Sequence, residues 1–183
     1  MNSSKEKLLK KQIAGLDAKE LLLSVDRIGM KDLVASLETE GYFKAQAAKK
    51  YHCNYEGGLV DHSLSVYVLF NELLDKFGLE LSKDSRIIVS LLHDYCKVDE
   101  NKKLGHAIES IRRIEIYVCL TYIEREIIRF HMGMYGTEEF VNMSGWGKSE
   151  YSLRDLTMAF NSGLPLLFYF CDHLTTKYIE PVR

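Results

Sequence analysis

The sequence predicts an all-α helical bundle. Apolar residues recur with helical spacing along nearly the whole chain, no segment shows the alternation of a β-strand, and only two of the 183 residues are proline. With 46% hydrophobic residues, the chain can bury a sizeable core without disulfides or a structural metal. The length suits one domain, so we expect a single unit over residues 1–183, with N-terminal helices over 1–40 and a core over 41–177.

Five helices are expected in the N-terminal half. Each is an apolar run with helical period that lies between turn-forming residues, over the ranges 4–13, 17–26, 30–39, 62–77 and 82–94. Ser82 is suited to cap a helix N-terminus, and Gly78 is suited to end a helix. Residues 42–61 are expected to be irregular, with a sharp turn at Gly57-Gly58.

Four more helices are expected in the C-terminal half, over the ranges 105–119, 121–132, 152–161 and about 165–177. Pro165 suits the first turn of the last of these, because a helix has no use for an N–H there. Residues 133–150 carry four glycines and are predicted to form a long loop.

Composition narrows the functional classes. A net charge of −2 gives no basic field, so long nucleic acid is a less expected partner than a small molecule. The four cysteines are scattered and form no CxxC pair, as is typical of free thiols in a reducing cytosol. The N-terminus has no apolar signal-peptide segment, and no run approaches the roughly 18 apolar residues of a membrane span. We therefore expect a cytoplasmic protein without a membrane partner.

The stretch LLHDYCK, residues 91–97, places His93 and Asp94 side by side at the end of an apolar helix. A buried His–Asp pair is costly unless its charge is compensated. A metal ion is one source of compensation, and a structural hydrogen bond between the two side chains is the other. The dipeptide alone does not decide between them.

Further histidines and a carboxylate lie on other predicted helices. His62 opens an apolar helix, and Asp172 lies in LLFYFCDHL, where a carboxylate needs a partner. With His93 and Asp94 they make a plausible first metal site. His106 and His131 could hold a second ion that Asp94 bridges. A single histidine is more often a surface or core residue than a ligand, but the ordered set on successive helices favours metal.

These residues lie in segments that resemble the HD-domain metal-dependent phosphohydrolases. The resemblance is to small bacterial and phage HD family hydrolases and to the HD domain of certain 3′–5′ exoribonucleases, and it runs from about residue 41 to 177. The matching segments are GGLVDHSLSVY (57–67), LLHDYCK (91–97), GHAIES (105–110), FHMG (130–133) and LPLLFYFCDHLTTK (164–177).

The resemblance implies an HD-domain helical bundle and roles for individual residues. His62, His93, Asp94 and Asp172 match the positions that bind a metal, and His106 and His131 match those that hold a second metal in dinuclear members. Lys97 matches a lysine suited to contact phosphate. Two departures stand out. Glu109 replaces the lysine of a GHGEKS motif, which removes one possible phosphate contact, and Met132 stands where some phosphodiesterases have a second histidine.

We therefore expect a metal-dependent phosphohydrolase, either a phosphomonoesterase or a phosphodiesterase, acting on a nucleotide or a short nucleic acid. One or two divalent ions (Mn, Mg, Ni, Co, Fe or Zn) would activate water and draw charge from the phosphoryl oxygens. Asp94 and Lys97 are the expected catalytic residues. A small nucleotide or another phosphorylated small molecule is favoured, because the similar exoribonucleases carry a separate nucleic-acid-binding module and nothing here encodes one.

Substrate contacts are expected from four residues, each with a simpler alternative. Lys97 could hold phosphate or be an exposed lysine after a helix end, and His52 could touch substrate or be an ordinary loop histidine. Trp146, in a lid formed by the 133–150 loop, could stack on a base or cover the core. Lys148 could bind phosphate or lie on a solvated face.

Two other functional classes share the same residues. Four histidines and two aspartates are also the ligand set of HD-domain di-iron oxygenases, which would need iron and consume dioxygen. A non-catalytic module that binds metal and nucleotide is the other alternative. Retention of every metal position favours an enzyme over a pure binding module.

Overall fold

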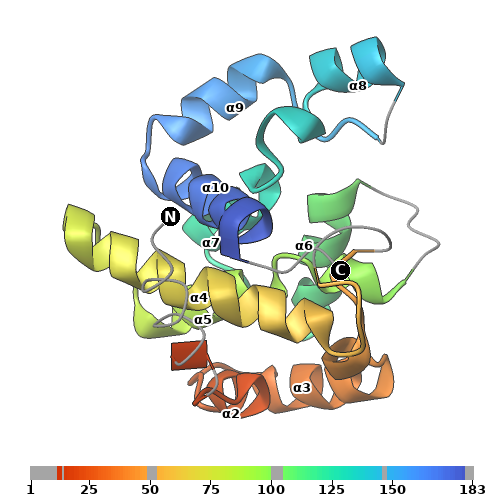
Figure 1. Ribbon diagram of the computed structural model, residues 1–183, viewed down its shortest axis with the longest axis vertical. Coiled ribbons are helices and arrows are strands. Elements are labelled where there is room, and N and C mark those ends of the chain that lie inside the picture. The colour runs from red at the N-terminus through yellow and green to blue at the C-terminus, as the bar shows by residue number, and fades with distance from the viewer. Residues whose placement is uncertain (1–11, 14, 49–52, 100–104, 146–147, 180–183) are drawn as a thin grey trace.

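A computed structural model shows the chain as an all-α fold (Figure 1). It describes residues 12–13, 15–48, 53–99, 105–145 and 148–179. Over these ranges no strand forms, and the only β-type pairing is an isolated bridge between Thr137 and Tyr151. The predicted fold class is confirmed.

The helices in chain order are α2 (Ala18–Leu23), α3 (Met30–Thr39), α4 (Gly58–Phe77), α5 (Lys83–Leu92), α6 (His106–Glu115), α7 (Tyr122–Phe130), α8 (Glu138–Ser144), α9 (Leu153–Phe160) and α10 (Leu164–Leu174). Short 3₁₀ turns lie at η1 (Tyr42–Lys44), η2 (Tyr95–Val98) and η3 (Gly133–Gly136). A π-helical turn, η4 (Thr175–Ile179), continues α10.

Several helix ends follow from local chemistry that the sequence displays. Ser82 Oγ accepts a hydrogen bond from the backbone N–H of Ser85 at 3.1 Å and so caps α5. Gly78 ends α4 with a positive φ of 63°, which costs glycine little. Pro165 lies in the first turn of α10 as predicted.

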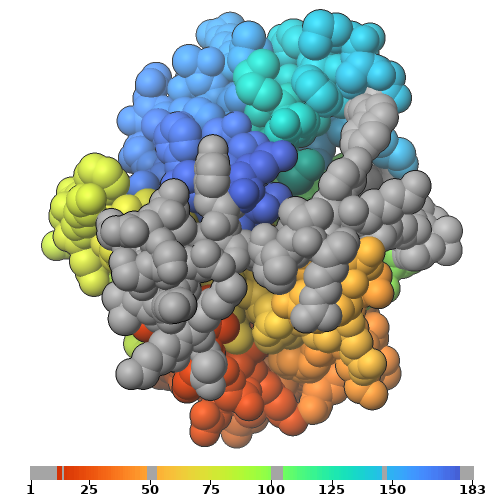
Figure 2. Space-filling view, in the orientation of Figure 1, coloured from red at the N-terminus to blue at the C-terminus, as the bar shows by residue number. Residues whose placement is uncertain are grey.

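Helix α4 packs against α5 and α10, and α10 also packs against α7. These helices form the middle of the molecule, with α2 and α3 at one end and α8 and α9 at the other (Figure 1). In the space-filling view, the cyan and blue residues of α8 and α9 make up the far upper part of the surface (Figure 2). Between α4 and α10 the rings of Phe70 and Phe168 meet edge to face at 5.0 Å. No helix within the described ranges is long and apolar enough to cross a membrane.

The boundaries differ from the prediction at several helices. The helix predicted over 62–77 begins at Gly58, because Gly57, with φ 83°, starts it directly at the expected turn. The helices predicted over 17–26, 105–119 and 121–132 end earlier, at Leu23, Glu115 and Phe130. Of the helix predicted over 4–13, all but residues 12–13 lie outside the described part.

The long loop predicted over 133–150 is wrong, because the segment holds both η3 and α8. Its glycines serve packing and helix ends. A Cβ at Gly133 would meet the Tyr169 ring at 2.2 Å, and one at Gly136 would meet the Tyr151 hydroxyl at 2.4 Å. Gly145 ends α8 in a left-handed conformation. Glycine here therefore permits close approach to aromatic rings, which a count of glycines does not distinguish from a loop.

A buried ion pair fastens the segment after α2 to α7. The guanidinium of Arg27 donates to both carboxylate oxygens of Glu124, at 2.7 and 2.6 Å, and the Glu124 side chain is fully buried. Burial alone would raise the pKa of Glu124, but hydrogen bonds from Arg27 and from its own helix cap lower it below the usual 4.5. The pair therefore contributes stability above about pH 4.5, and acid removes that contribution.

We expect Arg27→Met to lower the free energy of unfolding by about 3 kcal/mol at pH 7, because it leaves a buried carboxylate without its partner. In the variant, burial then raises the pKa of Glu124, so a proton neutralises it in mild acid. The difference from the wild type should shrink between pH 7 and pH 4, as measured by urea unfolding at both values. An equal difference at the two pH values would contradict this account.

Candidate metal centre

The six residues predicted as metal ligands come together from five different parts of the chain. Four lie at or next to a helix end, which lets side chains from separate helices meet. They are His62 in α4, His93 directly after α5, Asp94 before η2, His106 at the start of α6, His131 directly after α7, and Asp172 in α10. His62, His93, Asp94 and His131 are almost completely buried.

The start of α4 explains the position of His62. A Cβ on Gly58 would lie 2.0 Å from the carbonyl oxygen of Cys53, so only glycine allows the helix to begin against that backbone. His62 follows one turn later and points into the interior, where it meets His93 and Asp172. The Gly57-Gly58 pair therefore fixes where the first candidate ligand lies.

Three ligand atoms form the first group. His62 Nε2 lies 3.2 Å from His93 Nε2 and 3.2 Å from Asp172 Oδ1, and the last two atoms are 4.0 Å apart. Ligands bound about 2.0–2.2 Å from one ion are themselves roughly 3–3.5 Å apart. This spacing fits a single ion held by the three side chains.

Asp94 divides its two oxygens between two sets of partners. Oδ2 faces His62 and His93 Nε2, at 3.6 and 3.5 Å, and accepts from the Lys97 ammonium at 2.5 Å. Oδ1 contacts His106 Nε2 and lies 3.6 Å from His131 Nε2. A carboxylate with histidine on each side can bridge two ions, which is the role predicted for Asp94.

Backbone contacts orient two of the histidine rings. Nδ1 of His93 lies 2.9 Å from the carbonyl oxygen of Ser90, and Nδ1 of His131 lies 2.6 Å from that of Ile128. A ring that donates from Nδ1 keeps Nε2 for a ligand. Nε2 of His131 is buried and has no hydrogen-bond partner among the described residues. Such an orphaned nitrogen beside a carboxylate fits a metal-binding position.

The protonation states of His93 and Asp94 suit metal binding at neutral pH, whereas that of His131 does not. Burial lowers the pKa of His93 to about 3, so its ring is neutral. Burial would raise the pKa of Asp94. The positive charge of Lys97 and the hydrogen bond with His106 outweigh burial and lower this pKa well below its usual value, so Asp94 is ionised. Burial lowers the pKa of His131, but the Asp94 and Asp172 carboxylates more than reverse this. Metal binding at His131 would therefore compete with a proton.

A pocket of about 210 Å³ opens onto the cluster. Its lining includes five of the predicted residues: Asp94, Lys97, His106, His131 and Asp172. It also includes Met132, which the sequence shows only as a departure from a motif, and three residues not predicted at the site: Tyr135, His173 and Thr176. One of these three has a signal in the sequence, because His173 directly follows a predicted ligand.

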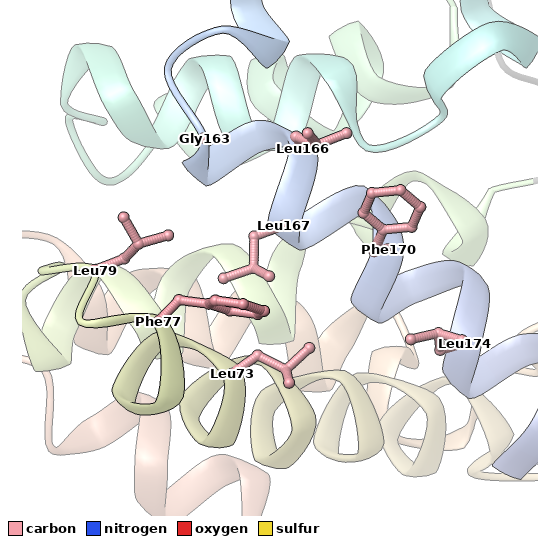
Figure 3. A pocket seen from close by; sticks show the side chains of 8 residues that line it. All are labelled: Leu73, Phe77, Leu79, Gly163, Leu166, Leu167, Phe170 and Leu174. Carbon is pink, nitrogen blue, oxygen red and sulfur yellow. The ribbon is translucent and has the colours of Figure 1, made fainter. Parts of the chain in front are cut away.

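A larger groove of about 580 Å³ lies between the end of α4 and α10. Its lining side chains are apolar, among them Leu73, Phe77 and Phe170 (Figure 3). None of the candidate ligands lines it. Four candidate ligands, Asp94, His106, His131 and Asp172, line the smaller pocket instead.

The predicted substrate contacts fare differently. Lys97 lies at the cluster and lines its pocket. Lys148 is exposed and does not line that pocket. His52 and Trp146 lie outside the described residues. The lid predicted for residues 133–150 is corrected to a folded segment, and Tyr135 from its η3 turn forms part of the pocket wall.

Glu150 supports the helix that carries His106. Its carboxylate accepts from the backbone N–H of Ala107, at 3.0 Å, and of Ile108, also at 3.0 Å. Gly105, the N-cap residue of α6, has no side chain to do this, and a Cβ there would lie 2.3 Å from the Glu150 side chain. Glu150 therefore caps α6 from a distant segment, where a negative charge also suits the helix dipole.

We expect Glu150→Ala to destabilise the protein by about 1 kcal/mol, as the loss of a helix cap does. It should also lower the affinity for the ion bound through His106 by about 10–100-fold, because the residue that holds the start of the His106 helix in place is lost. Thermal melting and metal titration measure the two effects. Glu139, which caps α9 by accepting from Leu153 N at 3.1 Å, is the matched control. Glu139→Ala should cost similar stability with metal affinity unchanged, and equal metal affinities in the two variants would contradict the proposed support.

Comparisons of the chain with family models, with curated proteins and with solved structures each returned no match. The resemblance to HD-domain phosphohydrolases therefore stays a prediction from the quoted motifs.

Proposed function

We propose that the chain is a metal-dependent phosphohydrolase of the HD-domain type, acting on a nucleotide or another small phosphorylated molecule. The observation that carries this proposal is the position of Asp94. Its two oxygens face separate histidines, and Lys97 adjoins it in the lining of the same pocket. Carboxylates, imidazoles and a cation in one pocket suit phosphate-ester hydrolysis.

The residues present fit one or two divalent ions. His62, His93, Asp94 and Asp172 would hold the first ion, and His106 and His131 with Asp94 would hold the second. Imidazole and carboxylate together suit first-row divalent metals, so Mn, Ni, Co, Fe and Zn are candidates, as is Mg. When bound, such ions supply Lewis-acid chemistry that polarises phosphoryl oxygens and activates water.

Lys97 would bind a phosphate oxygen of the substrate. Burial lowers the pKa of Lys97, but the charge and the hydrogen bond of the Asp94 carboxylate, together with the charge of Asp172, raise it above its usual value. The ammonium is therefore charged at neutral pH, and about a fifth of the side chain is exposed. A fixed positive charge in a partly buried pocket holds phosphate more strongly than one in open water.

The pocket wall would limit the size of the substrate. Tyr135, His173 and Thr176 line the pocket together with the candidate ligands. Its volume, about 210 Å³, is below the roughly 300 Å³ at which ligand pockets usually begin. This favours a small phosphate ester, or the terminal group of a larger one, over the interior of a polymer.

The decisive experiment is a screen of the purified protein against nucleoside mono-, di- and triphosphates, cyclic nucleotides and short oligonucleotides. Each is tested with Mn²⁺, Mg²⁺, Ni²⁺, Co²⁺, Fe²⁺ and Zn²⁺ in turn. We expect hydrolysis with at least one small substrate, lost on treatment with a chelator and restored by the ion. Dioxygen consumption with iron and no hydrolysis would support an oxygenase instead. Binding of nucleotide without turnover under any ion would support a non-catalytic module.

A further inference from the structure

A buried thiol lies next to the part of the cluster that contains Asp94 and His106. Sγ of Cys96, one oxygen of Asp94 and one nitrogen of His106 all lie within 4.8 Å of one another. Cys96 is completely buried. In the sequence it stands only as one of four scattered cysteines.

A hydrogen bond joins the turn that contains Cys96 to the helix that begins with His106. Cys96 lies in η2, and its N–H donates to Ser110 Oγ at 3.1 Å. Ser110 belongs to α6, the helix that begins with His106. The turn with Asp94 and Cys96 therefore stays in fixed register with the helix that presents the imidazole.

We propose that Cys96 is a protein ligand, as a thiolate, of the ion held by Asp94 and His106. On binding, the thiol would lose its proton to solvent and form a bond between Sγ and the metal. The proposal rests on the proposed function only in requiring an ion beside Asp94 and His106. It does not require hydrolysis of any substrate.

A sulfur ligand would narrow the choice of metal at this position. Thiolate is a soft ligand that favours Zn²⁺ and similar borderline ions, whereas Mg²⁺ prefers oxygen. The first group, His62, His93 and Asp172, offers only nitrogen and oxygen. The two positions would therefore prefer different ions, with the softer ion at Cys96.

Cys171 provides a matched control. It is also completely buried, and it directly precedes the candidate ligand Asp172. Among the described residues, however, it belongs to no group of candidate ligands. Burial raises the pKa of its thiol, as expected for a cysteine that serves packing. Both cysteines are thus buried close to a candidate ligand in the sequence, but of the two only Cys96 lies near two ligand atoms of other residues.

The test is cobalt binding in a Cys119→Ser background, which removes the exposed thiol. Cobalt bound by nitrogen and oxygen shows weak visible bands, and a thiolate ligand adds a strong charge-transfer band in the near ultraviolet. We expect that band in the parent and in Cys171→Ser, and its loss in Cys96→Ser. Cys96→Ser should also lower the affinity for one cobalt ion at least about tenfold. Loss of a ligand costs no less affinity than loss of a residue that only orients a ligand.

Two results would overturn the proposal in distinguishable ways. Cobalt bound with visible bands and without the charge-transfer band in the parent would exclude Cys96 and leave the metal centre standing. No cobalt binding at all would remove the metal centre and the ligand together.

X-ray absorption on zinc-loaded parent protein gives the same answer without the Cys96 substitution, should that variant not fold. Zinc bound to sulfur has a scatterer at about 2.3 Å, whereas nitrogen and oxygen lie at about 2.0–2.2 Å. We expect a sulfur contribution in the parent and in Cys171→Ser. Nitrogen and oxygen scatterers alone would overturn the proposal.

Discussion

Replacing Asp94 with alanine is expected to abolish hydrolysis and to lower the affinity for both metal ions at least about a hundredfold. The reason is that its two oxygens face different partners. Oδ2 faces His62 and His93, and Oδ1 faces His106 and His131. One substitution therefore removes a ligand from each proposed ion.

The fold should survive this change, because the core of the bundle is built from apolar residues elsewhere in α4, α5, α7 and α10. Some stability is still lost, since Lys97 no longer has the carboxylate that accepts its hydrogen bond. We expect a cost of about 1–3 kcal/mol. Metal stoichiometry and a melting curve, measured on the same preparation, separate the two effects.

Asp61 provides the control for this experiment. It precedes His62 in α4, but its exposed carboxylate accepts from the Tyr55 hydroxyl at 2.8 Å. Asp61→Ala should keep full metal content and activity. If Asp94→Ala is destabilised yet retains its metal, Asp94 is a structural residue and the two-ion site proposed here is incorrect.

The sequence shows which residues meet, because their chemistry conflicts with their surroundings. His93 and Asp94 end an apolar helix, and Asp172 interrupts another, so each needs a partner wherever it is buried. Helix lengths from apolar periodicity then place most candidate ligands at helix ends. This reasoning needs only local patterns and the cost of burying charge.

Contacts between distant segments could not be predicted in the same way. The carboxylate of Glu150 caps α6 across more than forty residues, and Tyr135 reaches the pocket from a segment that its glycines identified as loop. Nothing near Cys96 in the sequence indicates that it lies close to His106. Each of these contacts depends on how closely two distant segments approach each other, and the periodicity of apolar residues gives no information about that distance.

Replacing Lys97 with glutamine is expected to change metal binding and hydrolysis in opposite directions. Its ammonium lies 2.5 Å from Asp94 Oδ2, so it would compete with an ion for that oxygen. Without the charge, metal affinity should rise.

Hydrolysis by the Lys97→Gln variant should fall about 10²–10³-fold, as on removal of one preorganised group that stabilises developing negative charge. Metal titration and kcat, measured on Lys97→Gln and on Lys76→Gln as an exposed control from α4, separate the two effects. Loss of metal together with activity would show that Lys97 only maintains the site. Unchanged hydrolysis would show that it is an ordinary lysine after a helix end. Because a structural role predicts weaker metal binding and a substrate role predicts the reverse, the sign of the change in metal affinity decides between them.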